Sequence, residues 1–329
     1  MTGSEAALLD VRDLSVSFAT PRDRVTALDG VSLTVREGEV VGLVGESGSG
    51  KSVTALSILG LLGEQGRIDA GQIVFQGRDL VPLPEREWLG VRGRQIAMVF
   101  QEPMTSLNPL LPVGFQVAEV LEAHLGLGRR AALRQAVERF RDVGIPDPER
   151  RVGDYPHQLS GGMRQRVVIA MAMACRPRLL IGDEPTTALD VTIQAQILAL
   201  LRDLGQAAGT AVLLISHDLG VVAAMASRVI VMYAGEVVEE APTRELFREP
   251  RHPYTRLLLA VAPSVREKRP RLSAIAGSIP APSARPVGCR FHPRCPDAIP
   301  LCREAAPALE AHESGRRARC WRATEGVRS

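Results

Sequence analysis

Two stretches within residues 8–44 alternate between apolar and polar positions with the two-residue period of β-strands. Leu8–Phe18 alternates loosely and Val31–Val35 alternates cleanly. Short apolar stretches at Val40–Val44, Gln72–Gln76 and Gln95–Phe100 predict three further strands.

Between residues 104 and 160 the apolar spacing lengthens to that of helices. Val113–Leu125 and Arg130–Val143 both place apolar residues on one helical face, and glycines separate the two segments. This region is predicted to be a helical insertion within a larger domain.

After Ser160, predicted helices and strands alternate along the chain. Such alternation predicts an α/β domain with a largely parallel sheet. The helices are Gly161–Cys175, Thr192–Gln206 and Leu219–Met225, and the strands are Leu179–Ile181, Ala211–Ile215 and Arg228–Met232.

Composition divides the chain into a large acidic part and a small basic one. The whole chain of 329 residues has a net charge of +3, yet residues 251–329 carry 15 basic and 6 acidic side chains. A stretch rich in Pro, Ser and Arg at 263–288 predicts a linker between a domain at 1–262 and a C-terminal domain at 289–329. No apolar run reaches the roughly 18 residues of a membrane span, and the N-terminus lacks the pattern of a signal peptide, so we expect a soluble, cytoplasmic chain.

The candidate chemistry begins with a glycine-rich loop between the predicted strand Val40–Val44 and a predicted helix at Val53–Leu59. The motif G-x-x-x-x-G-K-[ST] in this setting predicts a phosphate-binding loop, because glycines let backbone N–H groups and the helix N-terminus approach phosphate oxygens. We expect Lys51 to reach the β- and γ-phosphates of a nucleotide and the Ser52 hydroxyl to hold Mg²⁺. The loop consists of Gly45, Glu46, Ser47, Gly48, Ser49, Gly50, Lys51 and Ser52.

Two more motifs lie downstream of this loop. An apolar strand ends in Asp183 and Glu184, where an ATPase needs one carboxylate near Mg²⁺ and one to polarise the attacking water. Ser160, Gly161 and Gly162 precede a helix, where Ser160 is placed to cap the helix and to approach phosphate.

Together these motifs resemble those of the ATP-binding-cassette (ABC) ATPases, over roughly residues 8–250. The resemblance implies an ABC-type ATPase fold, with a β subdomain and a helical insertion, in which two ATPase domains meet head to tail and the Ser160–Gly162 motif of one closes the ATP site of the other. Met163 departs from the family pattern, which has glutamine there. The implied roles are Gln101 as the Mg²⁺-sensing glutamine, His217 as the γ-phosphate switch, Asp190 in the loop Ala188-Leu189-Asp190, and Phe18 as the residue stacking on adenine.

The segments 101–109, 184–192 and 252–255 narrow the resemblance to the D-type ATPases of dipeptide and oligopeptide permeases. The family implies an assembly at the cytoplasmic face of the membrane, with a second, different ATPase, two transmembrane permease subunits and an extracytoplasmic solute-binding protein. Nickel or glutathione import by the same machinery and a soluble, non-transport ABC ATPase are the alternatives. We expect no nucleic-acid partner, because the chain lacks aromatic platforms for bases.

Four of the five cysteines lie in the C-terminal part, at Cys289, Cys295, Cys302 and Cys320. Their wide spacing suits an iron–sulfur cluster better than zinc, whose ligands are usually paired more closely. The same region resembles the C-terminal extension of the D-type ATPases, some of which bind a [4Fe–4S] cluster. We therefore expect such a cluster, with zinc or no metal as alternatives.

Overall fold

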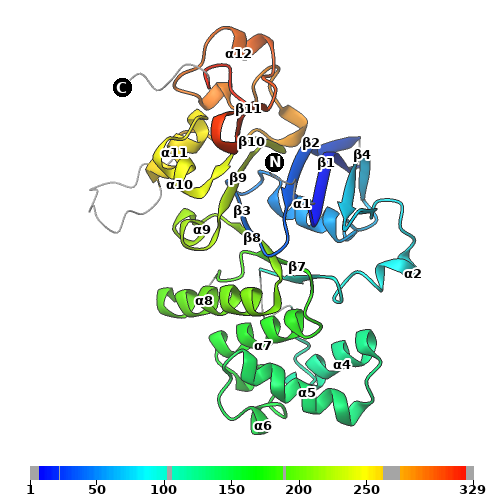
Figure 1. The fold of residues 1–329 in the computed structure, drawn as a ribbon. Coiled ribbons are helices and arrows are strands. Elements are labelled where there is room, and N and C mark those ends of the chain that lie inside the picture. Colours follow the sequence, from blue (N-terminus) through cyan, green and yellow to red (C-terminus); the bar gives the residue numbers. More distant parts are fainter. Residues whose placement is uncertain (1–6, 22, 102–105, 188–189, 262–274, 324–329) are drawn as a thin grey trace, which may run out of the picture. The chain divides into compact units, whose positions relative to one another are not determined.

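The computed structural model describes residues 7–21, 23–101, 106–187, 190–261 and 275–323 (Figure 1). The chain forms two compact units, which are treated separately below. We call the described residues within 36–39 and 82–214 the helical unit, and the described residues within 7–35, 40–81 and 215–323 the loop unit.

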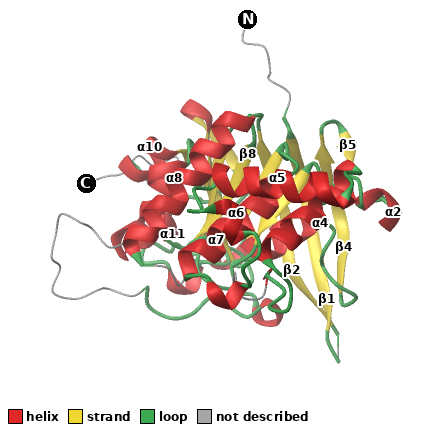
Figure 2. Cartoon of the chain, turned by 90° about the horizontal axis from the view of Figure 1, so that it is seen from below, coloured by secondary structure: helices red, strands yellow, loops and turns green. Residues whose placement is uncertain are grey.

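The loop unit contains an antiparallel sheet in its first part, where the alternating pattern predicted strands. Strand β1 (Leu9–Ala19) lies between β2 (Arg24–Val35) and β4 (Gly66–Phe75), and the short β5 (Arg78–Asp79) follows β4. Figure 2 shows β1, β2 and β4 as long neighbouring strands.

A second group of strands in the same unit carries the glycine-rich loop. Strand β3 (Val40–Val44) pairs in parallel with β9 (Arg228–Tyr233), and helix α1 (Lys51–Ile58) follows the loop. On the far side of β9 the pairing becomes antiparallel through β10 (Glu236–Pro242), β12 (Arg316–Ala318) and β11 (Glu310–His312). The helices of this part are α9 (Leu219–Met225), α10 (Thr243–Arg248), α11 (Pro253–Val261) and α12 (Leu301–Glu304), with 3₁₀ turns at Pro282–Ala284, His292–Arg294 and Glu313–Gly315.

The helical unit places its strands beside a group of packed helices. Strands β6 (Ile96–Val99) and β7 (Leu179–Asp183) pair in parallel. Strand β8 (Ala211–Ser216), most of which belongs to this unit, lies on the other side of β7. Helix α5 packs against both α4 and α7. The helices are α2 (Glu85–Trp88), α4 (Val113–Leu125), α5 (Arg129–Asp142), α6 (Pro148–Arg151), α7 (Gly161–Met173) and α8 (Val191–Ala208), with a 3₁₀ turn at Pro156–Gln158.

The described elements confirm the α/β prediction, and most boundaries agree within a few residues. Helices 113–125 and 219–225 have the predicted ends. The antiparallel extension formed by β10, β11 and β12 was not predicted, since its strands are short and rich in charged residues. Among the helices of the described chain, none is both long enough and apolar enough to cross a membrane.

The loop unit has a buried core that joins early and late parts of the sequence. It includes Val44 at the end of β3, Val231 of β9, Tyr254 of α11 and Phe291 near the C-terminal cysteines. Residues 275–323, which we call the C-terminal segment, thus share a hydrophobic core with the strand that leads into the glycine-rich loop. The first part of the predicted linker, residues 263–274, lies outside the described residues.

Candidate nucleotide-binding site

The glycine-rich loop has the backbone that the motif predicts. Gly45 and Gly50 adopt φ angles of +155° and +109°. A Cβ atom at Gly45 would come within 2.3 Å of the Met232 carbonyl oxygen, and one at Gly50 within 2.6 Å of a Leu28 methyl group. Only glycine therefore fits either position without displacing its neighbours.

Lys51 is buried at the start of α1 and faces back across the loop. Its Nζ donates hydrogen bonds to the carbonyl oxygens of Gly45, at 2.7 Å, and Glu46, at 3.0 Å. The next residue, Ser52, is exposed in the first turn of the helix. A buried ammonium beside an exposed hydroxyl and a helix N-terminus is a suitable arrangement for a phosphate chain and its cation.

Residues far along the sequence hold this loop in place. The Glu46 amide donates to the Tyr254 hydroxyl at 2.9 Å, and burial raises the pKa of Tyr254, so that this hydroxyl stays protonated. The Gly235 amide donates to the Ser49 carbonyl at 2.8 Å. Neither support was predicted from the sequence. The segment 252–255 was noted only as a resemblance, although it contains the tyrosine.

In the helical unit, the structure brings together two predicted residues. Glu184 follows β7, and its carboxylate accepts hydrogen bonds from Gln101 Nε2, at 3.2 Å, and from Thr187 Oγ1, at 3.0 Å. Glu184 has a φ of +49°, which is uncommon for a residue other than glycine. Asp183, at the end of β7, is buried. Residues with such a strained backbone, here Glu184, cluster at functional sites.

Two further predicted residues, Ser160 and Asp190, cap helices of the same unit. Ser160 Oγ accepts from the Met163 amide at 3.4 Å and so caps α7, while Asp190 Oδ1 accepts from the Ile193 amide at 3.0 Å and caps α8. A Cβ atom at Gly162 would stand 3.0 Å from Ile193, so this glycine permits close packing between the two helix starts.

The remaining predicted residues belong to the loop unit. Phe18 lies near the end of β1, opposite Val25 and Gly66, and is partly exposed. His217 is exposed directly after β8. The structure therefore groups Phe18, the glycine-rich loop and His217 in one unit, and Gln101, Asp183, Glu184, Ser160, Gly161, Gly162 and Asp190 in the other. Ala188 and Leu189 of the predicted loop, and residues 102–105, lie outside the described residues.

Comparisons with known proteins decide the family. Residues 28–187 match the "ABC transporter" family, and residues 238–302 match the "Oligopeptide/dipeptide transporter, C-terminal region". A dipeptide transport ATP-binding protein of Haemophilus influenzae is 51% identical over 314 residues, which cover 95% of each chain. An oligopeptide transport ATP-binding protein of Bacillus subtilis is 50% identical, over 96% of this chain and 97% of that protein. The chain belongs to the ATP-binding proteins of dipeptide and oligopeptide ABC transporters.

A solved relative supports the same fold for this ABC ATPase. A dimeric ATP-binding cassette in a post-hydrolysis state, bound to ADP and phosphate, is 31% identical with a TM-score of 0.64. The match covers 72% of this chain and 99% of that one. The predicted ABC-type ATPase fold, the ATPase activity and the family resemblance are thereby confirmed. The predicted separate cysteine-rich extension finds no such support.

The four C-terminal cysteines line one small cavity, together with Phe291 and other residues. All four are free thiols, and burial raises the pKa of Cys289 and of Cys295 to about 11. Across the described residues, however, no three Cys, His, Asp or Glu side chains are grouped closely enough to hold a metal ion. The alternative of a zinc site finds no support, since four sulfurs around zinc must each lie about 2.3 Å from the ion.

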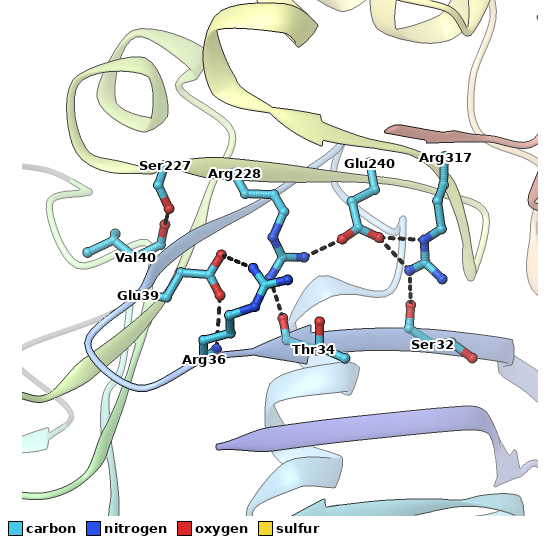
Figure 3. A network of polar contacts seen from close by, with 9 residues as sticks. All are labelled: Ser32, Thr34, Arg36, Glu39, Val40, Ser227, Arg228, Glu240 and Arg317. Carbon is cyan, nitrogen blue, oxygen red and sulfur yellow. Dashed lines mark hydrogen bonds and ion pairs between the residues drawn. The ribbon is translucent and has the colours of Figure 1, made fainter. Parts of the chain in front are cut away.

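The positive charge of the C-terminal segment is paired largely within the loop unit. Figure 3 shows the Glu240 carboxylate between Arg228 and Arg317, with Arg228 also bound to the Thr34 carbonyl and Arg317 to that of Ser32. The Arg317 guanidinium of the C-terminal segment is therefore already bound to oxygens of β2 and β10. Further arginines of the segment with partners inside this unit are Arg285, Arg290, Arg294, Arg316 and Arg319.

Proposed function

We propose that this chain hydrolyses ATP to power the import of dipeptides or oligopeptides through a membrane permease. The observation that carries the proposal is the near full-length match, at about half identity, to peptide transport ATP-binding proteins. That match extends beyond the ATPase motifs into residues 238–302, which belong to the oligopeptide/dipeptide transporter family. Nickel or glutathione as cargo has no corresponding support.

The contacts within each unit, together with the family resemblance, support the proposed catalytic roles. The glycine-rich loop and Lys51 would bind the phosphates, and Ser52 and Asp183 would hold Mg²⁺, which supplies charge stabilisation at the transferred phosphate. Glu184, positioned by Gln101 and Thr187, would accept a proton from the attacking water. His217 would contact the γ-phosphate, and Phe18 would stack on the adenine ring.

A complete site is proposed to need two ATPase chains. Ser160, Gly161 and Gly162 start a helix whose N-terminus is suited to phosphate, and in a head-to-tail dimer they would close a partner's site. The related cassette solved with ADP and phosphate is a dimer. We propose a second, different ATPase as the partner, with two permeases and a solute-binding protein completing the assembly. The chain would then act peripherally at the cytoplasmic face of the membrane.

The function can be tested by uptake in the source cell. Deletion of the gene is expected to abolish uptake of a labelled dipeptide, and wild-type protein to restore it. The variant Lys51→Ala should not restore uptake, because the phosphates lose their main cation. Unchanged dipeptide uptake, with loss of nickel or glutathione uptake instead, would overturn the proposed cargo.

We further propose that Cys289, Cys295, Cys302 and Cys320 hold an iron–sulfur cluster. Support comes from their convergence on one cavity. Cysteine sulfurs around a four-iron cluster stand farther apart than around a single ion, so the lack of a grouping for one ion does not decide the matter. Anaerobic purification should give iron and sulfide bound to the wild-type protein and little of either in Cys302→Ser. A metal-free wild type would refute this assignment.

A further inference from the structure

The C-terminal segment contacts the phosphate-binding loop through one ion pair. Arg294 Nη1 lies 2.8 Å from Glu46 Oε2, and Arg294 Nη2 lies 3.1 Å from Glu46 Oε1. The pair is bidentate, and the arginine side chain is only 5% exposed, whereas the Glu46 side chain is 30% exposed. Bidentate pairs between guanidinium and carboxylate fix orientation as well as distance.

Arg294 is itself held firmly by its surroundings. Its Nε donates to the Ala276 carbonyl at 2.9 Å, and its Nη2 reaches the Ile275 carbonyl at 3.3 Å. The guanidinium also donates to the Tyr233 hydroxyl at 3.4 Å. Because these contacts restrict the side chain before any nucleotide arrives, Arg294 can hold Glu46 at little additional entropic cost.

A second route connects the C-terminal segment to the loop from another side. Arg290 donates to the Ala234 carbonyl at 2.7 Å and pairs with Asp29. Ala234 precedes Gly235, whose amide donates to the Ser49 carbonyl at 2.8 Å. The segment therefore supports the glycine-rich loop at two points, directly at Glu46 and through the β9–β10 turn at Ser49.

We infer that Arg294 is a positioning residue for ATP binding, and that the C-terminal segment keeps the phosphate-binding loop in its nucleotide-accepting shape. The Glu46 carboxylate points to Arg294, so its part in the site is to anchor the loop, while its amide is held by Tyr254. The loop must present several backbone N–H groups to phosphate at once, and a loop that loses its anchor must be ordered by the nucleotide. This inference deepens the proposed function, since it concerns the same ATP site.

The test measures binding of a fluorescent ATP analogue to the full-length chain, and steady-state hydrolysis by that chain assembled with its partner ATPase. Glu46→Gln and Arg294→Gln should each weaken binding about tenfold, the effect of losing a charged hydrogen bond of about 1.4 kcal/mol. KM should rise by a similar factor while kcat changes less than about twofold, because Asp183 and Glu184 are untouched. The double variant should bind no more weakly than either single one, since both remove the same pair.

Two controls separate positioning from damage to the fold. Arg303→Gln alters an exposed arginine of the same segment and should leave affinity unchanged. Arg294→Lys keeps the charge without the two-point contact and should recover only part of the affinity. Thermal unfolding of each variant shows whether the segment still folds; Glu46→Gln retains every contact of Arg294 with Tyr233, Ile275 and Ala276.

Unaltered affinity in Glu46→Gln and Arg294→Gln would overturn the inference, as would additive losses in the double variant. Either result leaves the proposed function standing, because the wild type still binds and hydrolyses ATP. A wild-type chain that binds no ATP would overturn both.

Discussion

The two units support their functional residues in different ways. In the helical unit the supports are mostly local: Ser160 and Asp190 cap the helices that follow them, and Glu184 is bound by Thr187, three residues away. In the loop unit the glycine-rich loop depends on residues about 200 positions or more away. Glu46 contacts Tyr254 and Arg294, at separations of 208 and 248 residues.

This difference matters for how each motif becomes active. A cap or a turn forms as soon as its own few residues fold. The contacts that hold Glu46 of the phosphate-binding loop form only when α11 and the C-terminal segment pack beside it. The chemistry of the loop is thus encoded in eight consecutive residues, but its shape is maintained by the end of the chain.

The largest effect is expected from a substitution that removes the proposed general base of the helical unit and leaves the glycine-rich loop intact. Glu184→Gln should lower ATP hydrolysis about 10³-fold, because a general base contributes 10²–10⁴-fold and the amide cannot accept the proton. Binding of the fluorescent ATP analogue to the full chain should stay within about twofold, since the loop unit keeps its contacts. Hydrolysis at the wild-type rate would remove Glu184 from its proposed role.

The comparison also explains how much of the structure the sequence predicted. The helices at 113–125 and 219–225 follow from apolar spacing, and the chemistry of Gly45–Ser52 follows from a contiguous motif. Both patterns lie within a few consecutive turns or residues, so they can be recognised without knowledge of the tertiary fold. The Gln101–Glu184 contact was not predicted, since 83 residues separate the two side chains and the family resemblance gave Gln101 only a role at Mg²⁺.

No local sequence pattern could predict which residues support the glycine-rich loop. Arg294 stands among many arginines in a basic region, and its pairing with Glu46 depends on a fold that brings residues 248 apart together. Strands β11 and β12 are three residues each, too short for a pattern to emerge. The metal-ion geometry at the cysteines likewise depends on side-chain placement that spacing does not determine.

A smaller effect compares two buried phenylalanines, one from each unit. Phe140 of α5 and Phe291 of the C-terminal segment are 0% and 1% exposed, so truncation of either to alanine should cost about 3–5 kcal/mol of unfolding free energy. Only Phe291 packs against Tyr233 and Tyr254, at ring distances of 5.1 and 5.3 Å. Phe291→Ala should therefore also weaken ATP binding several-fold, while Phe140→Ala should not.

Denaturant unfolding gives the stability loss, and titration with the ATP analogue below the unfolding transition gives the affinity. Equal affinities for Phe140→Ala and Phe291→Ala would show that packing within the aromatic cluster does not affect ATP binding by the loop. The comparison uses variants with similar stability losses, so a difference in affinity reports the position of each ring and not the stability of the chain.

The smallest expected effect concerns acid sensitivity of the loop unit. His252 is 1% exposed, its Nδ1 accepts the Tyr254 amide at 3.0 Å, and burial, aided by nearby arginines, lowers its pKa to about 3. The folded chain keeps this ring neutral, whereas the unfolded chain protonates it below about pH 6.5. The stability from the neutral ring is complete above that pH and is lost as the pH falls from 6.5 toward 3.

At pH 5.5, one unit below the unfolded pKa, protonation of His252 in the unfolded chain should lower the wild type's free energy of unfolding by about 1.4 kcal/mol relative to pH 7.5. His252→Asn retains an acceptor for the Tyr254 amide without a titrating ring, so its stability should fall less over the same range. His157→Asn, at an exposed position of the helical unit, is the matched control and should follow the wild type. Parallel pH profiles for wild type and His252→Asn would mean that acid sensitivity arises elsewhere, and that the tyrosine supporting Glu46 does not depend on a neutral His252.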